Sequence, residues 1–133
     1  MSMHPKQRQL EATLRTMCDD LDRYLEDTYG NRYPLHPNRM ERGKAASVAY
    51  DGLFSTGTQF TMGYGSNAGR GYIVDIDIVT LSRVAKEDVD EIEASAVKYL
   101  KQLLPAYFPD RTLDIVKDGN LYKIIGDFSL GTV

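Results

Sequence analysis

The chain has 133 residues, of which 42% are hydrophobic and 26% charged, and its formal net charge is −3. This composition is that of an ordinary globular protein and excludes a disordered or fibrous one, and the acidity argues against general nucleic-acid coating. No apolar run approaches the roughly 20 residues that span a bilayer, and the N-terminus MSMHPKQRQL lacks the apolar stretch of a secretory signal. With Cys18 as the one cysteine, we expect a single cytoplasmic domain over residues 1–133, without disulfides or membrane contact.

The first predicted element is an amphipathic helix from Pro5 to about Tyr29. Its apolar residues recur at spacings of three and four, which keeps one helical face dry, and Gly30 supplies the stop. The same stripe fits a short heptad seam, so pairing in a homodimer stays open beside packing on the chain's own sheet. Residues 31–57 hold neither helical nor strand periodicity, and we expect a long ordered loop with one helical turn near Ala45 to Tyr50.

Two half-buried strands follow, in TQFTMGY (residues 58–64) and GYIVDIDIVTL (residues 71–81), because apolar and polar residues alternate along each. The Gly-rich loop between them favours an antiparallel hairpin that turns over Gly65 to Gly71. Pairing around that loop predicts an apolar face with Tyr64 opposite Tyr72, Met62 opposite Val74, and Phe60 opposite Ile76. The other face then sets Thr61 and Gln59 opposite Asp75 and Asp77.

The second predicted helix covers Asp88 to Leu104, where apolar residues again recur at helical spacing. Asp88 and Glu91 stand at capping-box spacing before the apolar run, and Pro105 is expected to end the helix. Acidic residues occupy its first turns and lysines its later turns, an order that complements the helix dipole. The pattern therefore predicts a second amphipathic helix.

A second hairpin is predicted in TLDIVKDGNLYKIIGDF (residues 112–128). A two-residue turn at Asp118-Gly119 makes the faces and charges of the two strands agree. The predicted pairs are Leu113 with Ile124, Ile115 with Tyr122, and Asp114 with Lys123. The order αββαββ then predicts an α+β fold, in which both helices pack on one face of a mostly antiparallel four-stranded sheet, and it leaves the strand order open.

One motif suggests chemistry. In MGYGSNAGRGYIVDIDIV (residues 62–79), a Gly-Ser turn precedes two aspartates on a strand. Carboxylates at positions i and i+2 of a strand project from one face and can share Mg²⁺ ions. Gly65-Ser66 followed by Asp75-Ile76-Asp77 resembles the signature of the polymerase-beta-like nucleotidyltransferases.

That resemblance implies roles for particular residues. Ser66 would contact the nucleotide phosphates, and Asp75 and Asp77 would bind the metal. A third carboxylate would come from Asp127 or Asp114 on a later strand. The alternative is that Asp75 and Asp77 simply form the solvated face of the first hairpin, as polar residues of alternating strands commonly do.

The Gly-rich loop also suggests an anion site. Its glycines free the backbone to turn successive N–H groups toward an anion beside Arg70. Residues 31–72 carry 5 basic and 2 acidic side chains, so the long loop adds positive charge, and its tyrosines offer stacking platforms for single-stranded RNA. The loop thus joins the hairpin glycines as a candidate site, with these ligand-binding residues: Lys44, Gly65, Ser66, Gly69, Arg70 and Gly71.

The leading hypothesis is a small binding or regulatory module that recognises an anionic ligand, either a nucleotide or an RNA phosphate, through these two loops without a cofactor. Two alternatives remain. One is a metal-dependent nucleotidyltransferase-like enzyme that uses Mg²⁺ at Asp75, Asp77 and Asp127. The other is a protein interaction or oligomerisation domain that forms a homodimer.

Overall fold

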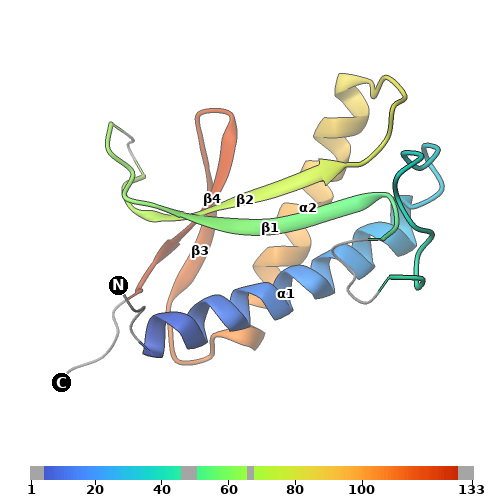
Figure 1. The fold of residues 1–133 in the computed structure, drawn as a ribbon. Helices are drawn as coiled ribbons and strands as arrows, with labels where there is room; N and C mark the ends of the chain where they lie inside the picture. Colours follow the sequence, from blue (N-terminus) through green and yellow to red (C-terminus); the bar gives the residue numbers. More distant parts are fainter. Residues whose placement is uncertain (1–4, 46–50, 66–67, 129–133) are drawn as a thin grey trace.

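The computed structural model describes residues 5–45, 51–65 and 68–128. Its elements are α1 (Pro5–Tyr29), β1 (Phe54–Thr61), β2 (Gly71–Ile78), α2 (Lys86–Tyr107), β3 (Leu113–Asp118) and β4 (Leu121–Gly126). The four strands form one antiparallel sheet in the order β1-β2-β4-β3. Both helices lie on the same face of the sheet (Figure 1), with α1 against β1 and α2 against β3. The predicted α+β fold is confirmed.

The core fills the space between the helices and the sheet. The apolar stripe of α1 is buried as its spacing predicts, and Leu14, Met17, Leu21 and Leu25 have no exposed surface. These residues pack with buried side chains from α2 and the strands, including Phe54, Ile92, Leu100, Ile115 and Ile124. Within the described ranges, no helix combines the length and the hydrophobicity that crossing a bilayer requires.

The first hairpin pairs in a different register from the predicted one. Phe60 lies opposite Tyr72 instead of Ile76, and Asp75 and Asp77 face Gly57 and Ser55 instead of Thr61 and Gln59. The strand begins at Phe54, whose fully buried side chain anchors the earlier part of the segment in the sheet. A shift of four residues preserves the alternation of faces, so the sequence pattern could not distinguish the two registers.

The helix α2 is longer at both ends than predicted. It begins at Lys86 after the N-cap residue Ala85, which makes no side-chain capping bond, so the predicted capping box is wrong. The Asp88 carboxylate instead accepts a hydrogen bond from the hydroxyl of Tyr33. Pro105 lies inside the helix, where its ring removes one backbone donor from the last turn, and the expectation that it ends the helix is wrong.

The second hairpin turns one residue later than predicted. Asp118 pairs with Leu121, so the two turn residues are Gly119 and Asn120, and the predicted turn at Asp118-Gly119 is wrong. Gly119 has a φ of +64°, and the non-glycine residue after it does not have a positive φ, which is the pattern of a type II′ turn. The new register shifts the pairing by two, so the apolar faces are kept and Ile115 lies opposite Ile124.

Candidate functional site

The long loop and the Gly-rich loop, which we expected to form one anion site, lie at opposite ends of the domain. The long loop precedes β1 and the Gly-rich loop follows it, so the length of an eight-residue strand, roughly 25 Å, separates them. Figure 1 shows them at the two ends of the β1–β2 hairpin. Arg42 and Lys44 therefore cannot share a ligand with Arg70, and the predicted convergence is corrected. Ser66 lies outside the described residues.

The arginines of the long loop are bound by the protein itself. Arg39 donates to the backbone carbonyls of Asp51, Gly52 and Phe54 at 2.8–2.9 Å. Arg32 donates to both carboxylate oxygens of Glu91 at 3.3 Å. The positive charges of Arg32 and Arg39, which we expected to attract a ligand, therefore attach the loop to α2 and β1.

Arg42 holds two buried carboxylates in a charged cluster under this loop. Its Nη1 lies 2.8 Å from Oδ1 of Asp22 and 3.2 Å from Oδ1 of Asp51, and these two aspartates are 0% and 2% exposed. Asp51 Oδ2 also accepts the backbone N–H groups of Gly43 and Ala45. Such a cluster fixes the path of the chain, because each buried charge needs its partners.

Asp22 stands out within the cluster. Its second carboxylate oxygen, Oδ2, has no hydrogen-bond partner among the residues that the structure describes. Burial raises the pKa of this carboxyl to about 6, although the guanidinium of Arg42 acts in the opposite direction. The position of Asp22 between the core residues Leu21 and Leu25 on the helix is a local signal for this cluster, because a buried carboxylate needs a cation.

The aspartates of the proposed metal site are not brought together. Asp75 and Asp77 are exposed on the face of β2 opposite the helices. Asp127 follows β4 at the end where β2 begins, so the rise along the strand places it roughly 20 Å from Asp75. Asp114 accepts the N–H of Ile115. In the described part of the chain, no group of three His, Cys, Asp or Glu residues is placed to hold a metal ion.

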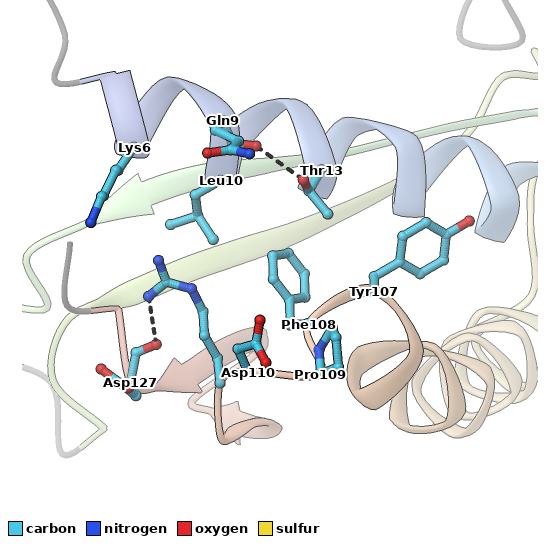
Figure 2. A pocket seen from close by; sticks show the side chains of 10 residues that line it. Lys6, Gln9, Leu10, Thr13, Tyr107, Phe108, Pro109, Asp110 and Asp127 are labelled. Carbon is cyan, nitrogen blue, oxygen red and sulfur yellow. Dashed lines mark hydrogen bonds between the residues drawn. The ribbon is translucent and has the colours of Figure 1, made fainter. Parts of the chain in front are cut away.

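A cleft opens at the same end of the domain as the Gly-rich loop. It has a volume of about 390 Å³ and lies between the first turns of α1, the turn that follows α2, and the residue that follows β4. Figure 2 shows Lys6 and Leu10 extending from α1 toward the cleft, and Phe108 and Asp110 facing them from the turn. Three segments that are far apart in the sequence therefore form its walls.

The cleft combines an apolar floor with charged walls. Leu10 and Phe108 are almost fully buried and form the floor, while Lys6, Arg111 and the carboxylates of Asp110 and Asp127 stand around it. The N-terminal end of α1 adds the positive end of a helix dipole. Clefts of this size with a few convergent polar groups are typical of small-molecule sites.

Backbone hydrogen bonds hold the wall after α2 in place. Phe108 donates to the carbonyl of Leu104, and Arg111 donates to that of Phe108, so the turn closes directly on the end of α2. Asp127 donates its backbone N–H to the Thr112 carbonyl at 3.1 Å, and its own carbonyl accepts from Arg111 Nη1 at 3.1 Å. The charged groups thus stand on a fixed frame before any ligand arrives.

The glycines of the hairpin loop have different structural needs. Gly65 and Gly69 have φ values of +76° and +73°, and a Cβ atom on either would meet nothing within 4 Å. A Cβ on Gly71, by contrast, would lie 2.3 Å from the carbonyl oxygen of Ile124, so this glycine is required by strand packing. Arg70 is exposed beside them.

The cleft has no signature in the sequence. Lys6 and Arg111 lie at opposite ends of the sequence, and Asp110 belongs to a short turn without a motif. Only the packing of α1 beside the end of α2 brings these residues together. No spacing rule could have found this site, because its geometry depends on the strand order and the crossing of the two helices.

The comparisons with known proteins agree with one another, and none of them names a function. A family model described as "Uncharacterised protein" matches residues 5–126. An uncharacterised protein of Borreliella burgdorferi is 49% identical over 123 residues, which cover 92% of this chain and 96% of that protein. No solved structure matches the chain. These matches supply no resemblance to the nucleotidyltransferases.

Proposed function

Since the chain belongs to this family of uncharacterised proteins, whose description names no activity, we propose a function from the cleft itself. The protein is a small binding module, and its ligand is a small molecule with one anionic group, a carboxylate or a phosphate. The observation that carries this proposal is the cleft of about 390 Å³ with Lys6 and Arg111 in its walls above an apolar floor.

The balance of charge favours a small molecule over a nucleic acid. Two cationic side chains, Lys6 and Arg111, share the cleft with the carboxylates of Asp110 and Asp127. A phosphate backbone binds surfaces on which positive charge accumulates over many contacts, and the two aspartates would repel it. A compact ligand can instead place its anionic group beside Arg111 and its apolar part on Leu10 and Phe108.

The side chains in the cleft favour binding over catalysis. The described residues that line it include no histidine, cysteine or serine, the side chains that most often act as nucleophile or general base. The thiol of Cys18 is buried in the core, and burial raises its pKa to about 11, so it is not available as a thiolate at neutral pH. The cleft does contain Lys6, Tyr107, Asp110 and Asp127, which are able to transfer protons, so the proposal of a binding module rests on the arrangement of charge and not on the absent residue types.

A ligand screen by thermal unfolding tests the proposal. A panel of small carboxylates, phosphate esters and nucleotides is added to the protein, and hits are confirmed by calorimetry. A ligand at about 100 times its Kd adds about 2.7 kcal/mol to the free energy of unfolding, a rise in Tm on the order of 10 °C. Arg111→Ala should lose this rise, while the matched variant Arg70→Ala, which removes an exposed arginine outside the cleft, should keep it.

The opposite pattern would identify the Gly-rich loop as the site. Gly65 and Gly69 hold positive φ values with open space above them, which is compatible with backbone N–H groups turned toward an anion. If Arg70→Ala removes the rise in Tm and Arg111→Ala keeps it, the anion binds at this loop and the cleft is rejected.

The nucleotidyltransferase-like alternative has its own arm in the same screen. Asp75 and Asp77 are both exposed on one face of β2, as metal-binding carboxylates of that family would be. Mg²⁺ together with a nucleoside triphosphate should then raise Tm, and the double variant Asp75→Asn/Asp77→Asn should abolish the rise. A rise that needs no divalent ion and survives the double substitution supports the binding module.

A further inference from the structure

The cleft between α1 and the turn after α2 holds equal numbers of positive and negative side chains. Lys6 and Arg111 supply the positive charges, and Asp110 and Asp127 supply the negative ones. A ligand with a negative group alone would be attracted by two of these side chains and repelled by the other two. A ligand that also carries a positive group would use both kinds of charge.

The carboxylate of Asp110 is placed to meet such a positive group. Asp110 is exposed in the wall of the cleft, and among the residues that the structure describes none pairs with its side chain or donates a hydrogen bond to it. Figure 2 shows it on the same wall as Phe108, facing Lys6 and Leu10 of α1. A negative group in the cleft therefore stands beside the apolar floor and across from a positive one.

Arg111 places a positive charge next to this carboxylate. Asp110 and Arg111 are neighbours in the chain, so their Cα atoms are about 3.8 Å apart, and both side chains line the cleft. Nη1 of Arg111 donates to the backbone carbonyl of Asp127 at 3.1 Å, which holds the guanidinium at the end of β4. Guanidinium groups bind carboxylates through two parallel hydrogen bonds. Opposite charges on adjacent residues suit a ligand whose own opposite charges are close together.

The start of α1 adds to the positive side of the cleft. The first turn of α1 contains no acidic residue, so no side chain of that turn neutralises the partial positive charge at the helix N-terminus. Lys6 extends from this turn toward the cleft (Figure 2). The negative group of a ligand is therefore best placed between Arg111 and the start of α1.

We propose that the cleft binds an α-amino acid with an apolar side chain. Its carboxylate lies between Arg111 and Lys6, and its ammonium group lies at Asp110. Its side chain rests on Leu10 and Phe108, which are almost fully buried. This inference rests on the proposed function and adds the positive group that the ligand carries.

The size of the cleft and the geometry of the ligand agree. An α-amino acid carries its ammonium and carboxylate groups on one carbon atom, which matches the adjacent charges of Asp110 and Arg111. Clefts that hold small ligands have volumes of about 300–1,000 Å³. The volume of about 390 Å³ lies near the lower end of that range, where a ligand the size of an amino acid fits.

Ligands that lose one charge at a time test the inference. Calorimetry with the full chain measures the Kd of leucine, methionine and phenylalanine, and of the amide of each, which lacks the negative charge. The deamino analogues, such as 4-methylpentanoate for leucine, lack the positive charge without added bulk. At least one of the three amino acids is expected to bind, and both of its analogues should bind roughly 10- to 100-fold more weakly, because each loses charge-assisted hydrogen bonds.

Asp110→Asn tests the proposed ammonium position, since it keeps the size of the side chain and removes its charge. The variant should bind the amino acid roughly tenfold more weakly and the deamino analogue no more weakly than the wild type does. The matched control is Asp27→Asn, at an exposed aspartate in the last turn of α1, roughly 30 Å along the helix from Lys6. Asp27→Asn should change neither affinity.

The outcomes separate this inference from the proposed function. If a deamino analogue binds as tightly as its amino acid and Arg111→Ala abolishes that binding, the cleft recognises a simple anion. The proposed function then stands, and the amino-acid inference is overturned. Amino-acid binding that is unchanged in Asp110→Asn overturns it as well, and so does the absence of binding by all three amino acids at millimolar concentration. An amide that binds as tightly as its amino acid overturns both, because no negative group is then needed.

Discussion

The two ends of this domain use similar charged residues for different purposes. At the end formed by the long loop, Arg39 and Arg42 are bound by carbonyls and buried carboxylates of the protein. At the other end, Lys6 and Arg111 stand in the wall of an open cleft. The count of basic residues along a segment therefore does not locate a ligand site. The two ends differ in where the fold places the cations, against buried carboxylates at one end and beside an open cleft at the other.

The largest expected effect is at Arg42. Arg42→Ala leaves Asp22 and Asp51 buried without their cation, and removing one partner from a buried ion pair costs about 3–5 kcal/mol. Equilibrium unfolding in urea measures the loss. Arg42→Lys should cost less, because it keeps the charge and loses only the planar contact to two carboxylates. A change of less than 1 kcal/mol in Arg42→Ala would mean that the cluster does not hold this end together.

The next effect concerns pH. Burial raises the pKa of Asp22 to about 6, above its value of 3.8 in the unfolded chain, so the folded state binds this proton more tightly. The stabilisation is fully present below about pH 4 and is lost as the pH rises through 6, a change of about 2–3 kcal/mol. Burial also raises the pKa of Glu26, which acts in the same direction.

Asp22→Asn isolates this contribution. The free energy of unfolding is measured from pH 4 to pH 8 for the wild type and the variant. The value for the variant minus that for the wild type should rise with pH, because only the wild type has a carboxylate at position 22 that ionises in the core. Carboxylates distant from Asp22 contribute equally to both curves and cancel, whereas Glu26, whose charge acts on Asp22, does not. A difference that stays flat across this range would show that Asp22 remains ionised in the folded protein at pH 4.

A smaller effect on stability is expected when alanine replaces either of two glycines in the hairpin loop. Gly63 and Gly65 have similar φ values, +73° and +76°, so alanine has the same backbone cost at both. A Cβ on Gly63 would lie 2.0 Å from the carbonyl oxygen of Gly69, whereas one on Gly65 meets nothing within 4 Å. Gly63→Ala should therefore be less stable than Gly65→Ala by about 1–2 kcal/mol, measured by thermal unfolding. Equal losses would contradict this close packing of the loop.

The sequence predicted element types and buried faces because these depend on local periodicity. The stripe of α1 and the alternation along β2 give the core side directly. Registers were wrong by four residues in the first hairpin and two in the second, since shifts of an even number keep every side chain on its face. What selects the register is the burial of Phe54 in one case and the positive φ of Gly119 in the other.

The candidate site was less predictable than the fold. The prediction of one site from Arg70 and Lys44 used closeness in sequence, whereas the strand between them holds the two loops apart. The cleft depends on contacts between the start of α1 and the turn after α2, where Lys6 and Arg111 are widely separated in the sequence. The buried cluster had a local signal in Asp22, but its partners come from a loop without periodicity.

The smallest expected effect on stability, at Arg111, sharpens the comparison of the two ends most directly. Its Nη1 donates to the backbone carbonyl of Asp127, which is an exposed residue. Arg111→Ala should therefore cost no more than about 0.5–1 kcal/mol, against about 3–5 kcal/mol for Arg42→Ala, in the same urea titration. If the two losses were equal, Arg111 would be a structural residue like Arg42, and the cleft would lose the cation on which the proposed anion recognition depends.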